Sequence, residues 1–130
     1  MQVPILKQGQ FLIASIQSAL TDTDLLQLRD NLVQQAGDRR ARGVIIDVTV
    51  LDVMDSFACR TLRALAQMLK LRGAETVIVG IQPDVAFAMV QLGLSLEGAT
   101  TALDLEEGMA LLQRQIQGGG QNVRSSARAH

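Results

Sequence analysis

Two short runs rich in valine and isoleucine, Val44–Val48 and Val77–Ile81, place the strongest constraint on how this chain can fold. A strand that is apolar on both sides belongs in the interior of a sheet whose two faces are covered. The segment between the runs carries apolar residues at helical spacing, which are Ala58, Leu62, Leu65 and Leu69. This order of strand, helix and strand predicts two parallel neighbouring strands joined by a right-handed crossover.

The remaining pattern completes an α/β fold with a mixed sheet. Short apolar runs at 3–6 and 11–16, separated by 7–10, predict an N-terminal antiparallel hairpin. Thr21–Asp24 supplies capping residues for a first helix. Three further elements are predicted in the second half: a helix from Pro83 to near Gly93, a short strand at 99–102, and a helix that begins at Asp104 and buries Leu105, Met109, Leu112 and Ile116.

Length and composition predict one domain followed by a tail. Residues 1–117 are enough to bury a core, whereas 118–130 is polar, rich in glycine and without periodicity, which predicts a flexible polar tail. The net charge of −1 argues against nucleic acid or an anionic membrane as the main partner. The chain also lacks a signal peptide and an apolar run near the ~20 residues of a membrane span, so we expect a cytoplasmic protein.

The residues that usually carry catalysis are scarce. His130 is the only histidine and lies at the end of the predicted tail, which argues against a histidine base or a histidine-based metal site. No glycine-rich phosphate loop follows a strand. Asp47, Asp52 and Asp55 are candidates for a magnesium site, but turn and capping roles are commoner for such residues. We therefore expect no enzyme activity, cofactor or metal.

Cys59 is the only cysteine, so an intrachain disulfide is impossible. Arg60 follows it and is positioned to lower the pKa of the thiol, which would favour a reactive cysteine. A small, buried side chain that fills space in the core is the commoner role, and we favour it.

Ser56 follows the predicted strand Val44–Val48 through a short acidic turn and lies at the start of a helix. Serine is frequent there because its hydroxyl caps a free backbone N–H group. The same free N–H groups and the positive end of the helix dipole also accommodate a phosphate. From the residues alone Ser56 is either a helix cap or a phosphorylation switch, and both interpretations stay open.

Five separated segments agree in order and spacing with one family: Pro4–Lys7, Val44–Thr49, Asp55–Phe57, Gly80–Pro83 and Thr101–Glu106. On these segments the chain resembles the STAS (sulfate transporter and anti-sigma factor antagonist) family over about residues 4–116. Within that family it is most similar to the single-domain RsbS-type stressosome scaffolds. The resemblance implies a mixed sheet with about four helices packed mainly on one face, and it identifies 1–117 as the STAS domain.

The resemblance also implies a mechanism and partners. Such scaffolds form homodimers and assemble with sensor-bearing STAS paralogues into a large hetero-oligomeric core. The unphosphorylated core sequesters a serine/threonine switch kinase, which is released after it phosphorylates the scaffold, and a dedicated phosphatase resets the serine. By position Ser56 is the phosphorylated residue, and Asp55 and Phe57 lie in the turn that the kinase recognises. Thr21 and Thr23 are candidates for further phosphorylation, although helix capping is the simpler role.

The residues after Ser56 distinguish between two types of protein within the family. Ordinary anti-anti-sigma factors continue after the serine with a small, glycine-containing segment, whereas Phe57-Ala58-Cys59-Arg60 follows here. This favours the stressosome type over a direct antagonist of an anti-sigma kinase. That direct antagonist remains an alternative, as does a small-ligand-binding domain that uses the loops at 49–56 and 80–83.

Overall fold

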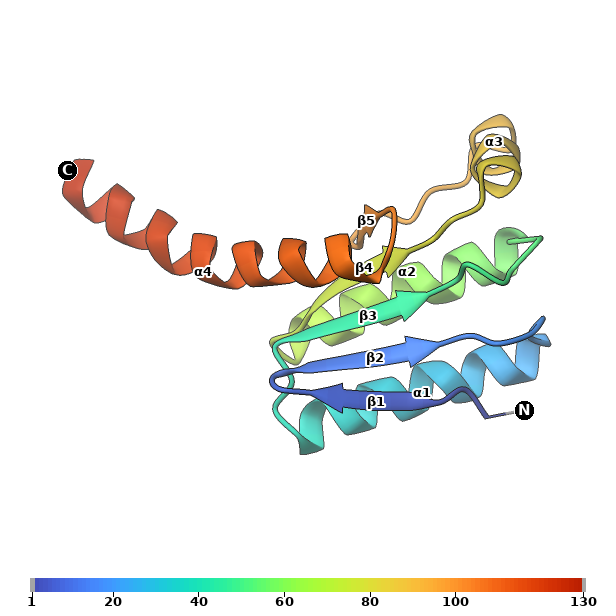
Figure 1. Cartoon of the computed structure of the whole chain (residues 1–130), viewed down its shortest axis with the longest axis horizontal. Helices are drawn as coiled ribbons and strands as arrows, with labels where there is room; N and C mark the ends of the chain where they lie inside the picture. The colour runs from blue at the N-terminus through green and yellow to red at the C-terminus, as the bar shows by residue number, and fades with distance from the viewer. Residues whose placement is uncertain (1, 130) are drawn as a thin grey trace.

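The computed structural model describes residues 2–129, with side chains described for 2–117. It contains one five-stranded sheet and four helices (Figure 1). In chain order the elements are β1 (Ile5–Gln8), β2 (Phe11–Ser15), α1 (Asp22–Asp38), β3 (Gly43–Asp47), α2 (Ser56–Leu71), β4 (Glu75–Val79), α3 (Pro83–Gln91), β5 (Thr100–Ala102) and α4 (Leu105–Ala129).

The sheet has the order β1-β2-β3-β4-β5 and is mixed. β1 and β2 form an antiparallel hairpin, whereas β2, β3, β4 and β5 pair in parallel. The predicted hairpin and the predicted parallel pairing of the two valine-rich and isoleucine-rich strands are both confirmed. β1 begins and ends two residues later than predicted, and its end at Gln8 follows from a tight turn: Gln8 pairs with Phe11, which leaves only two residues between the strands.

The alternation of side chains along the strands divides the core between the two faces of the sheet. Val44, Ile46 and Ile78 lie in the larger cluster, with leucines of α1 and α2. Ile45, Val77 and Val79 belong to a smaller cluster that also contains Leu112 of α4. β3 and β4 are therefore buried on both sides, as the sequence predicted.

The helices lie mainly on one face, as the family resemblance implied. α1, α2 and α3 each contribute buried residues to the larger cluster, whereas α4 contacts β3, β4 and β5 from the other side (Figure 1). Gly108 permits this contact, because a Cβ atom there would lie 2.7 Å from Cγ1 of Val79. Real Cβ atoms do not approach other atoms so closely, so a side chain at residue 108 would push α4 away from the sheet.

β4 ends two residues earlier than predicted. Gly80 has a φ of 81°, a left-handed conformation that breaks the extended strand after Val79. Ile81 still packs against the larger cluster from outside the strand, which explains why the apolar run continues beyond the strand.

α4 extends to Ala129, whereas the sequence predicted a flexible polar tail from Gly118 onward. Each glycine in a helix costs roughly 1 kcal/mol relative to alanine, so Gly118–Gly120 weaken the helix locally. Extending an existing helix is nevertheless much easier than starting one, and the packed segment before Gly118 provides the start. The mobility of this segment stays a prediction, since side chains beyond Gln117 and all of His130 lie outside the described residues.

Among the helices described, none is long and apolar enough to cross a membrane.

Leu112 tests the packing of α4 on the second face of the sheet, because its side chain is fully buried there. We expect Leu112→Ala to lower the free energy of unfolding by about 2–5 kcal/mol, since it leaves a cavity between α4 and the sheet. Gln113→Ala is the matched control, because that neighbouring side chain is exposed. Denaturant unfolding measures both, and equal stability of the two variants would contradict this placement of α4.

Candidate functional site

The loop between β3 and α2 carries the candidate serine and has a fixed shape at its start. Oδ1 of Asp47 accepts hydrogen bonds from the backbone N–H of Thr49 at 2.9 Å and from its hydroxyl at 2.6 Å. Leu51 and Met54 are buried and anchor the loop to the larger core cluster. Asp52, Val53, Asp55 and Ser56 are exposed between and after these anchors. The loop therefore presents its acidic and hydroxyl side chains on a well-supported backbone.

The connection between β4 and α3 supports the same loop from the side. Nε2 of Gln82 donates hydrogen bonds to the carbonyl oxygen of Thr49 at 2.8 Å and to Oδ1 of Asp52 at 3.3 Å. A Cβ atom at Gly80 would collide with the hydroxyl of Thr49, so glycine allows the two connections to lie in contact. The structure thus brings together the two loop regions that the sequence singled out, 49–56 and 80–83.

Asp55, and not Ser56, caps α2. Oδ1 of Asp55 accepts a hydrogen bond from the backbone N–H of Ala58 at 2.8 Å, and Asp55 has the extended backbone of an N-cap residue. Ser56 is the first residue of the helix and is exposed. The interpretation of Ser56 as the cap is therefore wrong. The reason is the position of the helix start. An N-cap side chain accepts a hydrogen bond from the N–H group three residues later, and Asp55 lies three residues before Ala58.

The hydroxyl of Ser56 is consequently available. Within the described part of the chain it has no hydrogen-bond partner. Phe57, the second residue predicted in the recognition turn, is half-buried, whereas Asp55 is exposed. The structure places Asp55, Ser56 and Phe57 consecutively at the start of α2, where the free N–H groups of the first turn lie.

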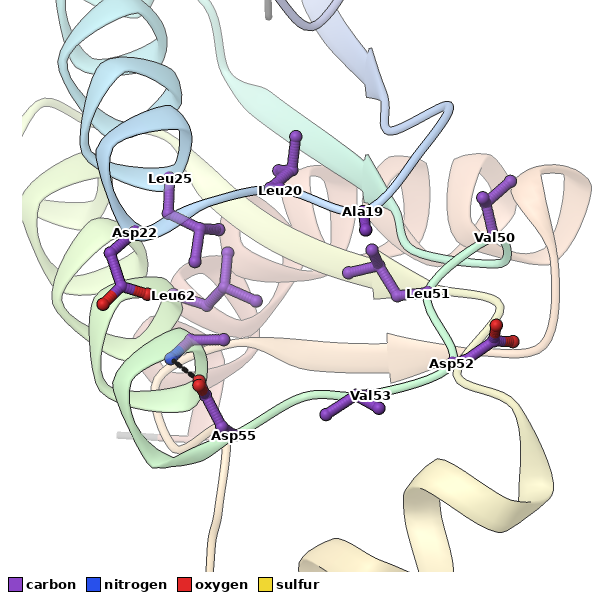
Figure 2. A pocket seen from close by; sticks show the side chains of 11 residues that line it. Ala19, Leu20, Asp22, Leu25, Val50, Leu51, Asp52, Val53, Asp55 and Leu62 are labelled. Atoms are coloured by element: carbon purple, nitrogen blue, oxygen red, sulfur yellow. Dashed lines mark hydrogen bonds between the residues drawn. The ribbon is translucent and has the colours of Figure 1, made fainter.

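A groove borders this helix start on the side of α1 (Figure 2). Its volume is about 440 Å³. Its apolar lining includes Leu20, Leu25, Leu51 and Leu62. Asp22, Asp52 and Asp55 contribute the charged side chains around it. The groove therefore combines an apolar interior with an acidic rim, and it adjoins the residue that precedes Ser56.

The three aspartates considered for magnesium have separate local roles. Asp47 closes the turn with Thr49, Asp55 caps α2, and Asp52 accepts a hydrogen bond from Gln82. No group of three or more histidine, cysteine, aspartate or glutamate residues that could hold a metal ion occurs among the described side chains. The predicted turn role is confirmed for Asp47 and the predicted capping role for Asp55, whereas Asp52 joins the two loops instead.

Cys59 lies in the core with 1% of its surface exposed. Burial raises the pKa of its thiol, and the carboxylate of Asp55 adds to the rise. The alternative of a cysteine activated by Arg60 is thus wrong, and the space-filling role is confirmed.

Thr21 caps α1, as predicted. Its hydroxyl accepts a hydrogen bond from the backbone N–H of Asp24 at 3.1 Å, and the Asp24 carboxylate accepts one from the backbone N–H of Thr21 at 3.0 Å. This reciprocal pair is a capping box. Thr23 lies one residue inside the helix and is exposed.

Gln82 was missed as a site residue in the sequence. It belongs to one of the five segments that resemble the STAS family, yet no local pattern indicates that an amide side chain there reaches Thr49. The available signal was Gly80, since a glycine directly after a buried valine-rich strand often marks a close approach of two backbones.

Comparison with known proteins finds the same family that the sequence segments indicated. A family model described as "STAS domain" matches residues 2–108. The RsbT co-antagonist protein RsbRC of Bacillus subtilis is 30% identical over 83 residues, which is 64% of this chain and 29% of the relative. The chain thus spans less than a third of the length of that curated relative.

Two solved structures resemble almost the whole chain. A serine-to-glutamate variant of RsbS from Moorella thermoacetica has a TM-score of 0.77 and 31% identity, with 90% of this chain and 99% of that chain covered. A chain of the stressosome, described as a signal integration and transduction hub, has a TM-score of 0.70 and 31% identity, covering 87% and 98%. The predicted fold class and the similarity to RsbS-type proteins are confirmed by these matches.

Capping by Asp55 can be tested by two substitutions. We expect Asp55→Ala to lower the free energy of unfolding by about 1 kcal/mol, because an N–H group of the first turn of α2 loses its acceptor. Asp55→Ser should retain most of the stability, since a serine at the N-cap can accept the same hydrogen bond. Denaturant unfolding compares the three proteins, and an Asp55→Ala variant as stable as the wild type would show that Asp55 is not the cap.

Proposed function

The chain belongs to the STAS domain family, and on this basis we propose that it is a non-enzymatic scaffold of the stressosome, switched by phosphorylation of Ser56. In the unphosphorylated form it sequesters a serine/threonine switch kinase. That kinase phosphorylates Ser56, and the kinase is then released from the scaffold. The observation that carries this proposal is the position of Ser56, exposed at the first residue of α2 while Asp55 supplies the cap.

This position allows modification without a change of fold. The hydroxyl of Ser56 holds no structural hydrogen bond among the described residues, so a phosphate on it displaces none. The free N–H groups and the dipole at the start of α2 favour a negative group there. Ser56 can therefore be phosphorylated and dephosphorylated on a scaffold that stays folded.

The same phosphate strongly changes the charge of the surface around Ser56. It adds about −1.5 to −2 charges at neutral pH, next to the exposed carboxylates of Asp52 and Asp55. Val50 and Val53, 48% and 74% exposed, lie on the same loop and offer an apolar contact to a partner. A partner that packs on these valines must tolerate the two carboxylates and is then repelled by the additional charge.

The similar proteins support an assembly with other STAS domains. RsbRC is named as a co-antagonist, and the stressosome chain covers nearly the whole fold. We therefore include a sensor-bearing STAS paralogue, a homodimer and a large hetero-oligomeric core in the proposal. A dedicated phosphatase resets Ser56, and the assembly is cytoplasmic.

Two alternatives remain within the family. A direct anti-anti-sigma factor would use the same exposed serine but bind an anti-sigma kinase one to one, without a large core. A small-ligand-binding STAS domain is favoured by one observation, the groove of about 440 Å³ beside Asp55. Light scattering of the chain expressed with its STAS paralogue separates the first alternative by particle size, and calorimetry with nucleotides tests the second.

Substitution of Ser56 tests the switch. We expect Ser56→Ala to bind the kinase and to retain it in the presence of ATP, because no phosphate can be added. Ser56→Asp should bind the kinase more weakly than the unphosphorylated wild type. It should still bind more tightly than the phosphorylated protein, since a carboxylate carries only one negative charge. Pull-down of the kinase with and without ATP measures both effects.

Ser95→Ala is the matched control, since Ser95 is an exposed serine elsewhere on the surface. It should be phosphorylated and should release the kinase like the wild type. Intact-mass measurement after incubation with kinase and ATP should show one added phosphate in wild type and Ser95→Ala, and none in Ser56→Ala. A phosphate that persists in Ser56→Ala refutes the assignment of Ser56.

A further inference from the structure

The helix that begins with Ser56 carries positive side chains but no acidic one. α2 contains two arginines and a lysine, and neither aspartate nor glutamate. An exposed positive side chain on a helix is stabilised by an acidic side chain three or four residues away. The residues at those distances from Arg60 are Ser56, Phe57, Arg63 and Ala64. Arg60 therefore has no acidic neighbour on its own helix.

Other elements do not supply a partner for Arg60 either. Its side chain is exposed and makes neither an ion pair nor a hydrogen bond among the described residues. Arg63, the next positive residue of α2, is half-buried and donates a hydrogen bond to the hydroxyl of Ser95 at 3.5 Å. Arg60 is consequently the positive side chain of α2 that lies nearest to Ser56 in the chain and is available to an anion.

Ser56 and Arg60 are neighbours on the surface of α2. They are four residues apart, which places them one helical turn apart on the same side of the helix. Long side chains on a helix lean over the turn that precedes them, so the guanidinium of Arg60 can reach the turn that starts with Ser56. An acidic group that precedes a basic one by four residues is also the more favourable order. A phosphate on Ser56 would provide that acidic group.

We propose that Arg60 binds the phosphate of phosphorylated Ser56 and that this ion pair within α2 keeps the phosphate fully ionised. The inference rests on the proposed phosphorylation of Ser56 and adds a residue that regulates the modified state. The planar guanidinium of arginine can donate two parallel hydrogen bonds to phosphate oxygens, which a lysine cannot do. Arg60 thus holds the phosphate in one place on the helix surface.

The carboxylates around Ser56 explain why a positive partner matters. Free N–H groups at the start of α2 attract a phosphate, but the carboxylate of Asp55 already lies there and accepts a hydrogen bond from Ala58. Asp22 and Asp52 add negative charge around the adjoining groove. These like charges favour the singly charged form of the phosphate, whose second pKa is ordinarily about 6. Arg60 opposes this effect, so that the phosphate keeps two negative charges at neutral pH.

A phosphorus NMR titration of the full chain with phosphoserine at residue 56 tests the proposal. Phosphoserine is introduced during synthesis of the chain, so the measurement does not require the kinase. We expect Arg60→Gln to raise the second pKa of the phosphate by about 0.3 or more, because the doubly charged form loses its positive partner. Arg60→Lys should raise it less, since the charge is retained but the paired hydrogen bonds are lost.

Lys70→Gln is the matched control, because it removes the same charge from an exposed residue of the same helix. Lys70 lies about 21 Å along the helix from Ser56, which is more than two Debye lengths at physiological ionic strength. This variant should leave the pKa of the phosphate unchanged. An unchanged pKa in Arg60→Gln, or an equal rise in Lys70→Gln, would overturn the pairing.

Denaturant unfolding provides a second measurement on four proteins, the wild type and Arg60→Gln, each with serine or phosphoserine at residue 56. Phosphorylation should change the unfolding midpoint of the wild type more favourably than that of Arg60→Gln, because only the wild type forms the ion pair. Equal changes would overturn the role of Arg60 and leave the switch at Ser56 intact. Failure of the kinase to modify Ser56 would instead refute the proposed function, whereas the pKa measurement would still decide the pairing.

Discussion

Burial of β3 and β4 on both faces is the constraint on which the rest of the structure depends. Val44 and Ile46 must face α1 and α2, while Ile45, Val77 and Val79 must face α4. Two such strands have to be central, so the hairpin strand β1 and the short β5 occupy the edges. Their parallel pairing also brings the ends of β3 and β4 to one edge of the sheet, where the connections to α2 and α3 leave side by side. The candidate site lies at this edge.

Support of the site is divided among several residues, and this division leaves the serine available. Gln82 holds the loop through Thr49 and Asp52, buried leucine and methionine side chains anchor it, and Asp55 caps the helix. Ser56 stands at the start of α2, and its hydroxyl makes no hydrogen bond among the described residues. Chemistry at Ser56 can then alter the surface charge at small cost to folding, which is what a reversible switch on a scaffold requires.

Much of this could be predicted from the sequence, because the determinants are local. The two central strands follow from apolar runs, the first helix from the capping residues at Thr21–Asp24, and the start of α3 from Pro83. The choice between Asp55 and Ser56 as cap could not be made, since both residue types cap well and only the position of the helix start decides. The reach of Gln82 to Thr49 connects residues 33 apart in the chain, and no periodicity records it. An amphipathic pattern likewise shows that α4 buries one side, but not which face of the sheet receives it.

The central claim is that phosphorylation of Ser56 weakens kinase binding without unfolding the scaffold. The most direct test prepares the chain fully phosphorylated and unphosphorylated, and measures the affinity for the kinase together with amide hydrogen exchange in α2. Our account predicts an affinity at least tenfold lower after phosphorylation, a change equivalent to about 1.4 kcal/mol, with unchanged protection in the core of α2. Equal affinity of the two forms, or loss of protection throughout α2, would contradict it.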